Sequence, residues 1–128
     1  AIEFWLSTAA SLLVLVALDR SSNTLEAVRY SGRFCVNILG AGQEELARRF
    51  ATKASGEEKL AGVEHELIDE VPVLGGTVAW LACELEQELD GGDHAILIGR
   101  PLEAGADAEA RPLVFYGGRY HAGTLEGP

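Results

Sequence analysis

The chain has 128 residues, of which 48% are apolar and 23% are charged, and its formal net charge is −10. This length and composition predict one soluble globular domain spanning residues 1–128. An acidic surface repels nucleic acids and anionic membranes, so we expect neither as a partner. A ligand that carries phosphate therefore requires a locally basic site.

The first apolar segment, Ile2–Leu18, resembles a signal peptide in composition. It has no basic n-region and carries Glu3 instead. It is also shorter than the ~20 apolar residues of a membrane helix. We therefore interpret it as a strand segment rather than a targeting segment. Within it, Ser11–Leu18 is expected to be a strand buried on both faces.

The next elements alternate between helix and strand up to about residue 52. A helix is expected to begin at Ser22, Asn23 or Thr24 and to end at Gly32. A half-buried strand is expected over 33–39 and a second helix over 43–51. The apolar residues expected on the buried sides of the two helices are Leu25, Val28, Leu46, Ala47 and Phe50.

The second half of the chain is predicted to be nearly all strand. Residues 52–62 are expected to form a polar loop, and 63–69 a short edge strand. The long strand Thr77–Leu89 has an apolar face on its odd positions, and its even positions become acidic from Glu84 onward. The remaining expected elements are a hairpin turn at 90–93, a return strand over 94–102, a solvent loop over 103–110 and a last strand over 111–121.

This order of elements decides between two fold classes. A doubly wound parallel sheet requires strand and helix to alternate to the end of the chain. Here the two helices are separated by one strand and the alternation then stops. The sequence therefore predicts a mostly antiparallel β-barrel with short helices.

A glycine-rich stretch, residues 40–45 (GAGQEE), follows the second strand and resembles the start of a dinucleotide-binding motif. The motif G-x-G-x-x-G requires a third glycine, which is Glu45 here. Glu44 and Glu45 would repel a pyrophosphate, although they suit the N-terminal end of a helix. We therefore favour a structural corner between strand and helix over a dinucleotide site.

A second candidate anion site is the stretch Arg20–Thr24, between the first strand and the first helix. Backbone N–H groups, hydroxyls and one guanidinium converge there, as in many phosphate sites. A simple helix N-cap beside a solvated arginine explains the same residues. The residues alone leave both interpretations open.

The two cysteines, Cys35 and Cys83, both lie inside apolar runs. We expect buried thiols rather than a disulfide framework or a zinc site. The chain has no Cys-x-x-Cys or His-x-x-x-His spacing, so no metal site is predicted. This cysteine usage fits a reducing cytoplasm, which is the expected location.

Three stretches in order resemble the flavin reductase-like family, which has the FMN-binding split-barrel fold. They are LVLVALDRSSNTLEAVRYSGRFCVNILGAGQEELARRFA, VPVLGGTVAWLACELEQELDGGDHAILIGR and PLVFYGGRY. The resemblance implies reduction of FMN or FAD with NADH or NADPH as hydride donor. It also implies a homodimer and a partner flavin-dependent monooxygenase that receives the reduced flavin.

The resemblance also implies roles for particular residues. His94 is expected beside the flavin ring and the nicotinamide as the catalytic residue. The expected cofactor-binding residues are Ser7, Asp19, Arg20, Ser21, Ser22, Thr24, Arg48, Arg49, Phe50, Arg119 and Tyr120. From its place after a hairpin turn, His94 is equally consistent with a structural role, and Tyr120 with barrel packing.

The N-terminus departs from the family pattern. Family members have a hydroxyl-rich segment that wraps the flavin ring, and here Phe4–Ser11 retains only Ser7 and Thr8. We therefore expect a split barrel that is shortened or altered at its N-terminus. This departure leaves open a second function, a non-catalytic module that binds flavin or another ligand.

Overall fold

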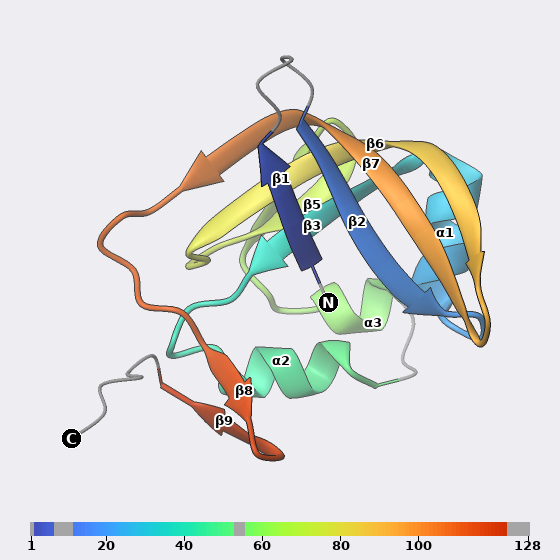
Figure 1. Ribbon diagram of the computed structural model, residues 1–128. Coiled ribbons are helices and arrows are strands. Elements are labelled where there is room, and N and C mark those ends of the chain that lie inside the picture. The colour runs from blue at the N-terminus through green and yellow to red at the C-terminus, as the bar shows by residue number, and fades with distance from the viewer. Residues whose placement is uncertain (1, 7–11, 53–55, 123–128) are drawn as a thin grey trace.

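The computed structural model describes residues 2–6, 12–52 and 56–122 and shows a mostly β protein with three short helices (Figure 1), as predicted. The strands are β1 (Ile2–Leu6), β2 (Leu12–Asp19), β3 (Arg33–Ile38), β4 (His65–Ile68), β5 (Val71–Leu74), β6 (Ala79–Gly91), β7 (His94–Ala106), β8 (Val114–Tyr116) and β9 (Arg119–His121). The helices are α1 (Asn23–Ser31), α2 (Glu44–Phe50) and α3 (Gly56–Leu60). No helix in the described ranges is both long and apolar enough to cross a membrane.

One five-stranded sheet forms the body of the molecule. Its strand order is β1-β2-β7-β6-β3, and each neighbouring pair is antiparallel. The long strands β6 and β7 form a hairpin in the middle of this sheet (Figure 1). Within the described ranges, the edge strands β1 and β3 are not paired with each other, so the sheet does not close into a complete barrel.

Helix α1 begins and ends where the sequence predicts. The Ser22 hydroxyl accepts hydrogen bonds from the backbone N–H groups of Thr24 and Leu25, as an N-cap residue does. Gly32 adopts the left-handed conformation (φ 73°) and donates its N–H to the Val28 carbonyl, which ends the helix. The helix contributes Leu25 and Val28 to the core, as expected.

The core lies between α1 and the sheet. Its apolar residues come from α1 and four strands: Val14, Leu25, Val28, Phe34, Val36, Leu81, Cys83, Ala95 and Leu97. Burial of these side chains is the main stabilising contribution to the fold. Strand β2 supplies Val14, but Leu13 on its opposite face is 39% exposed. The prediction that this strand is buried on both faces is therefore wrong.

The long strand β6 also differs from its prediction, because bulges interrupt its pairing with β7. Leu85 pairs with Gly99 and Gln87 pairs with Ile98, so Glu86 is an extra residue on β6. One inserted residue exchanges the two faces of a strand. Leu89 is consequently 41% exposed, and the odd positions do not form the continuous core face that the alternation predicts.

Further elements were assigned wrongly from the sequence. The expected loop over 52–62 contains α3, and Val71–Leu74 is an additional strand that pairs with β4. The expected loop over 103–110 begins later, because β7 continues to Ala106, which pairs with Ala79 of β6. The expected last strand is a hairpin, β8–β9, which turns at two glycines with positive φ.

The Asn37 side chain attaches the β4–β5 hairpin to the main sheet, and Arg33 of β3 adds a contact to the Asp69 carbonyl in the hairpin turn. The Asn37 amide on β3 donates to the Pro72 carbonyl at 3.2 Å and accepts from the Leu74 N–H at 2.9 Å. Two hydrogen bonds from one side chain thus place β5 beside β3. Between this hairpin, β3 and the helices lies the larger of the cavities described below.

Gly99 of β7 provides a direct test of core packing. A Cβ atom at this position would lie 2.4 Å from Cζ of Phe34 and 3.0 Å from Cβ of Cys83. We predict that Gly99→Ala lowers the free energy of unfolding by about 1–3 kcal/mol, measured by urea denaturation. The control is Gly42→Ala, where no heavy atom lies within 4 Å of the new Cβ. A Gly99→Ala protein as stable as this control would contradict the packing described here.

Candidate functional site

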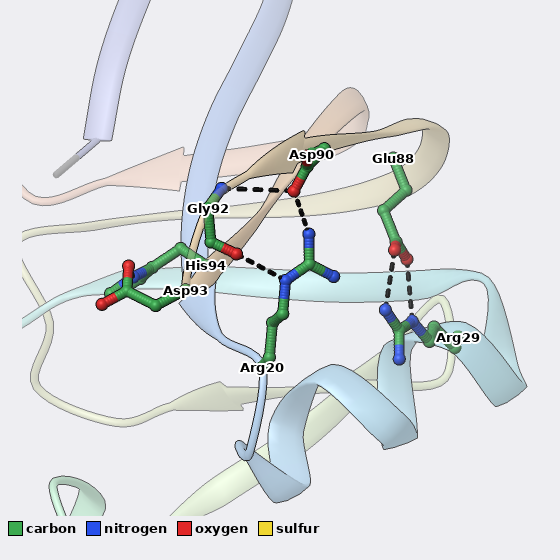
Figure 2. A network of polar contacts seen from close by, with 7 residues as sticks. All are labelled: Arg20, Arg29, Glu88, Asp90, Gly92, Asp93 and His94. Carbon is green, nitrogen blue, oxygen red and sulfur yellow. Dashed lines mark hydrogen bonds and ion pairs between the residues drawn. The ribbon is translucent and has the colours of Figure 1, made fainter.

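The predicted site residues lie in three groups, and the first surrounds the turn of the β6–β7 hairpin. Arg20 donates from Nε to the Gly92 carbonyl at 2.7 Å and from Nη2 to the Asp90 carboxylate. Figure 2 shows both contacts. The backbone N–H of Arg20 donates to the Asp93 carbonyl. Arg20 thus connects the end of β2 to the hairpin turn, and its guanidinium is paired with an acid rather than freely solvated.

The hydroxyls of Ser21 and Ser22 near the start of α1 are also engaged. Asp19 Oδ1 accepts from the backbone N–H of Ser21 at 2.8 Å and from its hydroxyl at 2.6 Å. Ser22 forms the N-cap described above. Of the two interpretations of Arg20–Thr24, the observed geometry matches the helix N-cap. Binding of a phosphate at this turn stays a prediction.

His94 is the first residue of β7 and lies opposite Asp19 in the sheet. His94 lies beside Asp93 (Figure 2). Its Nδ1 is 2.8 Å from Oδ1 of Asp93, and its side chain is 43% exposed. The hydrogen bond with His94 and the charge of that ring lower the pKa of the Asp93 carboxyl. In the described part of the chain nothing bonds Nε2 of His94. This nitrogen can therefore contact a ligand while Asp93 holds the ring.

A bidentate ion pair joins the same hairpin to α1. Arg29 donates from Nε and Nη2 to the two carboxylate oxygens of Glu88 at 2.8 and 2.7 Å (Figure 2). The hydrogen bond with Arg29 lowers the pKa of Glu88 and raises that of Arg29. Glu84 is paired with Arg100 of β7 through a single contact of 2.8 Å. The acidic side of β6 is therefore a solvated face, as predicted, and part of it is tied to α1.

The second group lies on α2 and the β8–β9 hairpin, which Figure 1 shows together, away from α1. The Arg48 guanidinium lies over the Tyr120 ring, 5.1 Å from its centroid, and pairs with Glu44 at 2.7 Å. Arg119 is exposed on β9. Tyr120 packs on Phe115 across the hairpin. No hydrogen bond or ion pair between described residues links this group to Arg20 or His94.

The third group lines a cavity of about 600 Å³ between α1, β3, β5, α3 and the last residue of α2. Thr24 and Phe50 are the predicted site residues in its lining. Arg49 lies nearby in sequence and donates to the Ala61 carbonyl at 3.0 Å. The lining also includes Asn23, Ala27, Val28, Tyr30, Ser31, Arg33, Phe34, Cys35, Asn37, Leu39, Gly56, Lys59, Leu60, Glu70, Val71, Pro72 and Leu74. Ser7 lies outside the described residues.

Lys59 is a lining residue that the sequence analysis missed. It lies on α3, is only 8% exposed, and donates from Nζ to the Phe50 carbonyl at 3.1 Å. The sequence places it beside Glu57 and Glu58 in a polar stretch, which favoured a solvated loop. The sequence contains one indication that Lys59 is buried, which is the apolar residue Leu60 beside it. In the structure both Lys59 and Leu60 line the cavity.

The glycine-rich corner is structural. The Gln43 amide accepts from the Gly40 N–H at 2.8 Å and donates to the Gly75 carbonyl at 2.7 Å. The Ala41 N–H donates to the Arg111 carbonyl. A Cβ at Gly40 would lie 2.8 Å from the Gly76 carbonyl oxygen, so the backbones approach too closely for a side chain. The backbone N–H groups of Gly40, Ala41 and Gln43, which a phosphate-binding loop would offer to its ligand, are therefore already engaged.

A second cavity, of about 550 Å³, lies between the β4–β5 hairpin and the start of β6. Its lining includes Glu64, His65, Trp80 and Asp107. The Trp80 indole packs closely over Gly105 of β7, where a Cβ would approach Nε1 to 2.4 Å. In the described ranges no group of three His, Cys, Asp or Glu side chains is arranged to hold a metal ion.

The sheet is antiparallel and is built around a long central hairpin, and short helices lie beside a cavity. These features define the class of protein as a split β-barrel. The family model for the flavin reductase like domain matches residues 4–124. The chain therefore belongs to the flavin reductase-like family, as the sequence motifs predicted.

Individual relatives agree with this assignment. A flavin reductase of Pseudomonas putida is 38% identical over 109 residues, which cover 84% of this chain and 63% of the relative. HsaB of Rhodococcus jostii (strain RHA1), the reductase subunit of a flavin-dependent monooxygenase, is also 38% identical over 109 residues, covering 84% and 55%. The chain thus spans about 55–63% of the length of these relatives.

A solved structure shows the same fold. The NADH:FAD oxidoreductase SgcE6 of Streptomyces globisporus C-1027, in complex with NAD and FAD fragments, superposes with a TM-score of 0.85 at 27% identity. The superposition covers 98% of this chain and 76% of that chain. The predicted split-barrel fold class is confirmed.

The two thiols give a prediction about pH. Burial raises the pKa of Cys35 to about 11 and that of Cys83 to about 12. Unfolded thiols have a pKa of about 8.5. The contribution of the two protonated thiols to the free energy of unfolding is therefore complete below that pH and is lost as the pH rises towards 11. We predict that the free energy of unfolding falls between pH 8 and pH 10, measured by urea denaturation.

The control is the Cys35→Ala/Cys83→Ala double variant, whose stability should depend less on pH in this range. Native protein at pH 8 should also react with iodoacetamide at least about tenfold more slowly than unfolded protein. Cys83 is buried as expected, whereas Cys35 is only partly buried and lines the cavity beside α1. Equal labelling rates in the two states would contradict the burial of Cys83 and the partial burial of Cys35.

Proposed function

We propose that this chain catalyses NAD(P)H-dependent reduction of FMN or FAD and supplies the reduced flavin to a partner monooxygenase. The observation that carries the proposal is the family match over residues 4–124 on a split-barrel fold. Two similar proteins support it: one is named a flavin reductase, and the other is named the reductase subunit of a flavin-dependent monooxygenase. The proposal includes a homodimer acting in the cytoplasm.

The cavity beside α1 fits the body of a flavin. Its volume of about 600 Å³ lies within the usual range for small-molecule sites. Its walls are mainly apolar, with Phe34, Leu39 and Val71 among them, as a planar aromatic ring system requires. Asn23 and Thr24 add an amide and a hydroxyl from the first turn of α1.

A bound flavin supplies N5, which accepts a hydride from C4 of the reduced nicotinamide. The protein has to place the two rings and exclude water. In the proposal, His94 donates a hydrogen bond from Nε2 to the nicotinamide carboxamide or to a flavin oxygen. Asp93 orients the imidazole through Nδ1, and Arg20 fixes the hairpin turn that carries both residues.

The other site residues inferred from the family keep their proposed roles. Asp19, Ser21, Ser22 and Thr24 line the approach to the flavin phosphate at the start of α1, together with Arg20. The residues proposed to close over the ligand are Arg48, Arg49, Phe50, Arg119 and Tyr120. In this chain Arg48 and Tyr120 are held against each other, so they act as one unit.

The test is a steady-state assay with the purified chain. FMN, FAD or riboflavin is mixed with NADH and then with NADPH, and the loss of reduced-nicotinamide absorbance is followed under anaerobic and aerobic conditions. Turnover that depends on added flavin supports the proposal. Flavin binding without turnover contradicts it and indicates a binding module instead.

His94→Ala is predicted to lower kcat/KM for flavin reduction by about tenfold to a hundredfold, because one positioned hydrogen bond is lost. His94→Gln, which retains a donor, should recover part of the rate. The matched control is His65→Ala, since His65 is an exposed histidine on β4 whose Nδ1 contacts the Val63 carbonyl. If the two alanine variants have equal rates and equal pH profiles, His94 has no role in the reaction.

A further inference from the structure

The turn of the β6–β7 hairpin, which leads into His94, is tied to α1 by an acid that follows the bulge in β6. We propose that this acid, Glu88, and its partner Arg29 are positioning residues that hold His94 in place during flavin reduction. The kinetic part of this inference rests on the proposed function. Its structural part, a hairpin turn fixed relative to α1, is measurable in the chain without any ligand.

The bulge in β6 decides which face of the sheet Glu88 occupies. Before the bulge, Glu84 lies opposite Arg100 of β7, which is exposed. After the bulge, Glu88 lies opposite Leu97, which is fully buried in the core. Directly opposite residues of an antiparallel pair lie on the same face of the sheet. The extra residue Glu86 therefore places Glu88 on the face that packs on α1, whereas Glu84 lies on the other face.

Two arginines pair with the acids that follow the bulge. Glu88 accepts from Arg29, in the last turn of α1, at 2.8 and 2.7 Å (Figure 2). Asp90, two residues further along the same face, accepts from Arg20, which precedes the helix. The hairpin is therefore attached near both ends of α1. A strand without the bulge would place Leu89 on this face instead, and both arginines would lack these partners.

A continuous set of contacts connects the Arg20 attachment to His94. The Gly92 N–H donates to the Asp90 carboxylate at 3.2 Å, and the Gly92 carbonyl accepts from Arg20 at 2.7 Å. The Arg20 N–H donates to the Asp93 carbonyl at 3.1 Å, and the Asp93 carboxylate bonds the His94 ring. A reacting group has to be held within about 0.5 Å of its productive position. A hairpin turn that is free to move would therefore misplace the imidazole.

The alternative is that Arg29 and Glu88 form an ordinary surface ion pair. Their side chains are 44% and 31% exposed, and exposed pairs contribute little to stability. In that case, removal of the pair would change neither the hairpin turn nor the reaction rate. The two roles therefore differ in the hydrogen exchange of the turn and in kcat, and both predict a nearly unchanged Tm.

The test variant is Glu88→Gln, which keeps the size of the side chain and removes its charge. The matched control is Glu84→Gln, which weakens a glutamate–arginine pair between β6 and β7 that does not involve α1. Amide hydrogen exchange of the ligand-free chain, followed by NMR, reports on the turn through the bonded N–H groups of Arg20 and Gly92. We expect Glu88→Gln to accelerate the exchange of both amides at least about fivefold, and Glu84→Gln to leave both within about twofold.

The kinetic test uses the flavin reduction assay described above. Glu88→Gln is expected to lower kcat by about threefold to tenfold and to leave the flavin KM within about twofold, because positioning affects hydride transfer rather than binding. The double variant Arg29→Glu/Glu88→Arg restores the pair with its charges reversed and should recover most of the rate. In the His94→Ala background, Glu88→Gln should have no further effect, because the group that it positions is absent.

The outcomes separate this inference from the proposed function. If the wild-type chain reduces no flavin, the proposed function fails, and the exchange rates alone decide whether Glu88 holds the turn. In an active chain, the inference is wrong if Glu88→Gln matches Glu84→Gln in exchange or in kcat. It is also wrong if the kinetic effect of Glu88→Gln persists without His94. Thermal denaturation of each variant shows whether a lower rate follows loss of folding.

Discussion

The pairing of the β6–β7 hairpin with β2 is the constraint on which the proposed site depends. It places His94 beside Asp19 at the end of β2, where α1 begins. Arg20 then fixes the turn through Asp90 and Gly92, and Arg29 holds β6 against α1 through Glu88. Each exposed ion pair contributes little energy by itself. Their main effect is to fix the position of the hairpin turn relative to the helix.

The distribution of charge explains why one lysine is exceptional. Arg20, Arg29, Arg48 and Arg100 are each paired with an acidic side chain at the surface. These pairs leave few cations for a ligand in a strongly acidic chain. Lys59 differs because it is buried, lines a cavity and, among the described residues, bonds one carbonyl oxygen.

Local chemistry made much of the fold predictable. A helix cap within Ser22–Thr24, the stop at Gly32 and the missing third glycine at Glu45 depend on adjacent residues, and the structure agrees with each and identifies Ser22 as the cap. The extra residue Glu86 in β6 could not be predicted, because a bulge depends on the partner strand. Likewise, the burial of Lys59 depends on the placement of α3 around the cavity that α1 and β5 also line. The sequence motifs predicted the family, while the cavity and its cation became visible only in three dimensions.

The central claim is that His94, oriented by Asp93 beside the turn of the β6–β7 hairpin, contacts the flavin or the nicotinamide of a bound pair. The most direct measurement is a crystal structure of the chain with FMN bound. The claim predicts the flavin ring system beside His94 and the phosphate at the start of α1. A flavin bound away from both the start of α1 and His94 would contradict it.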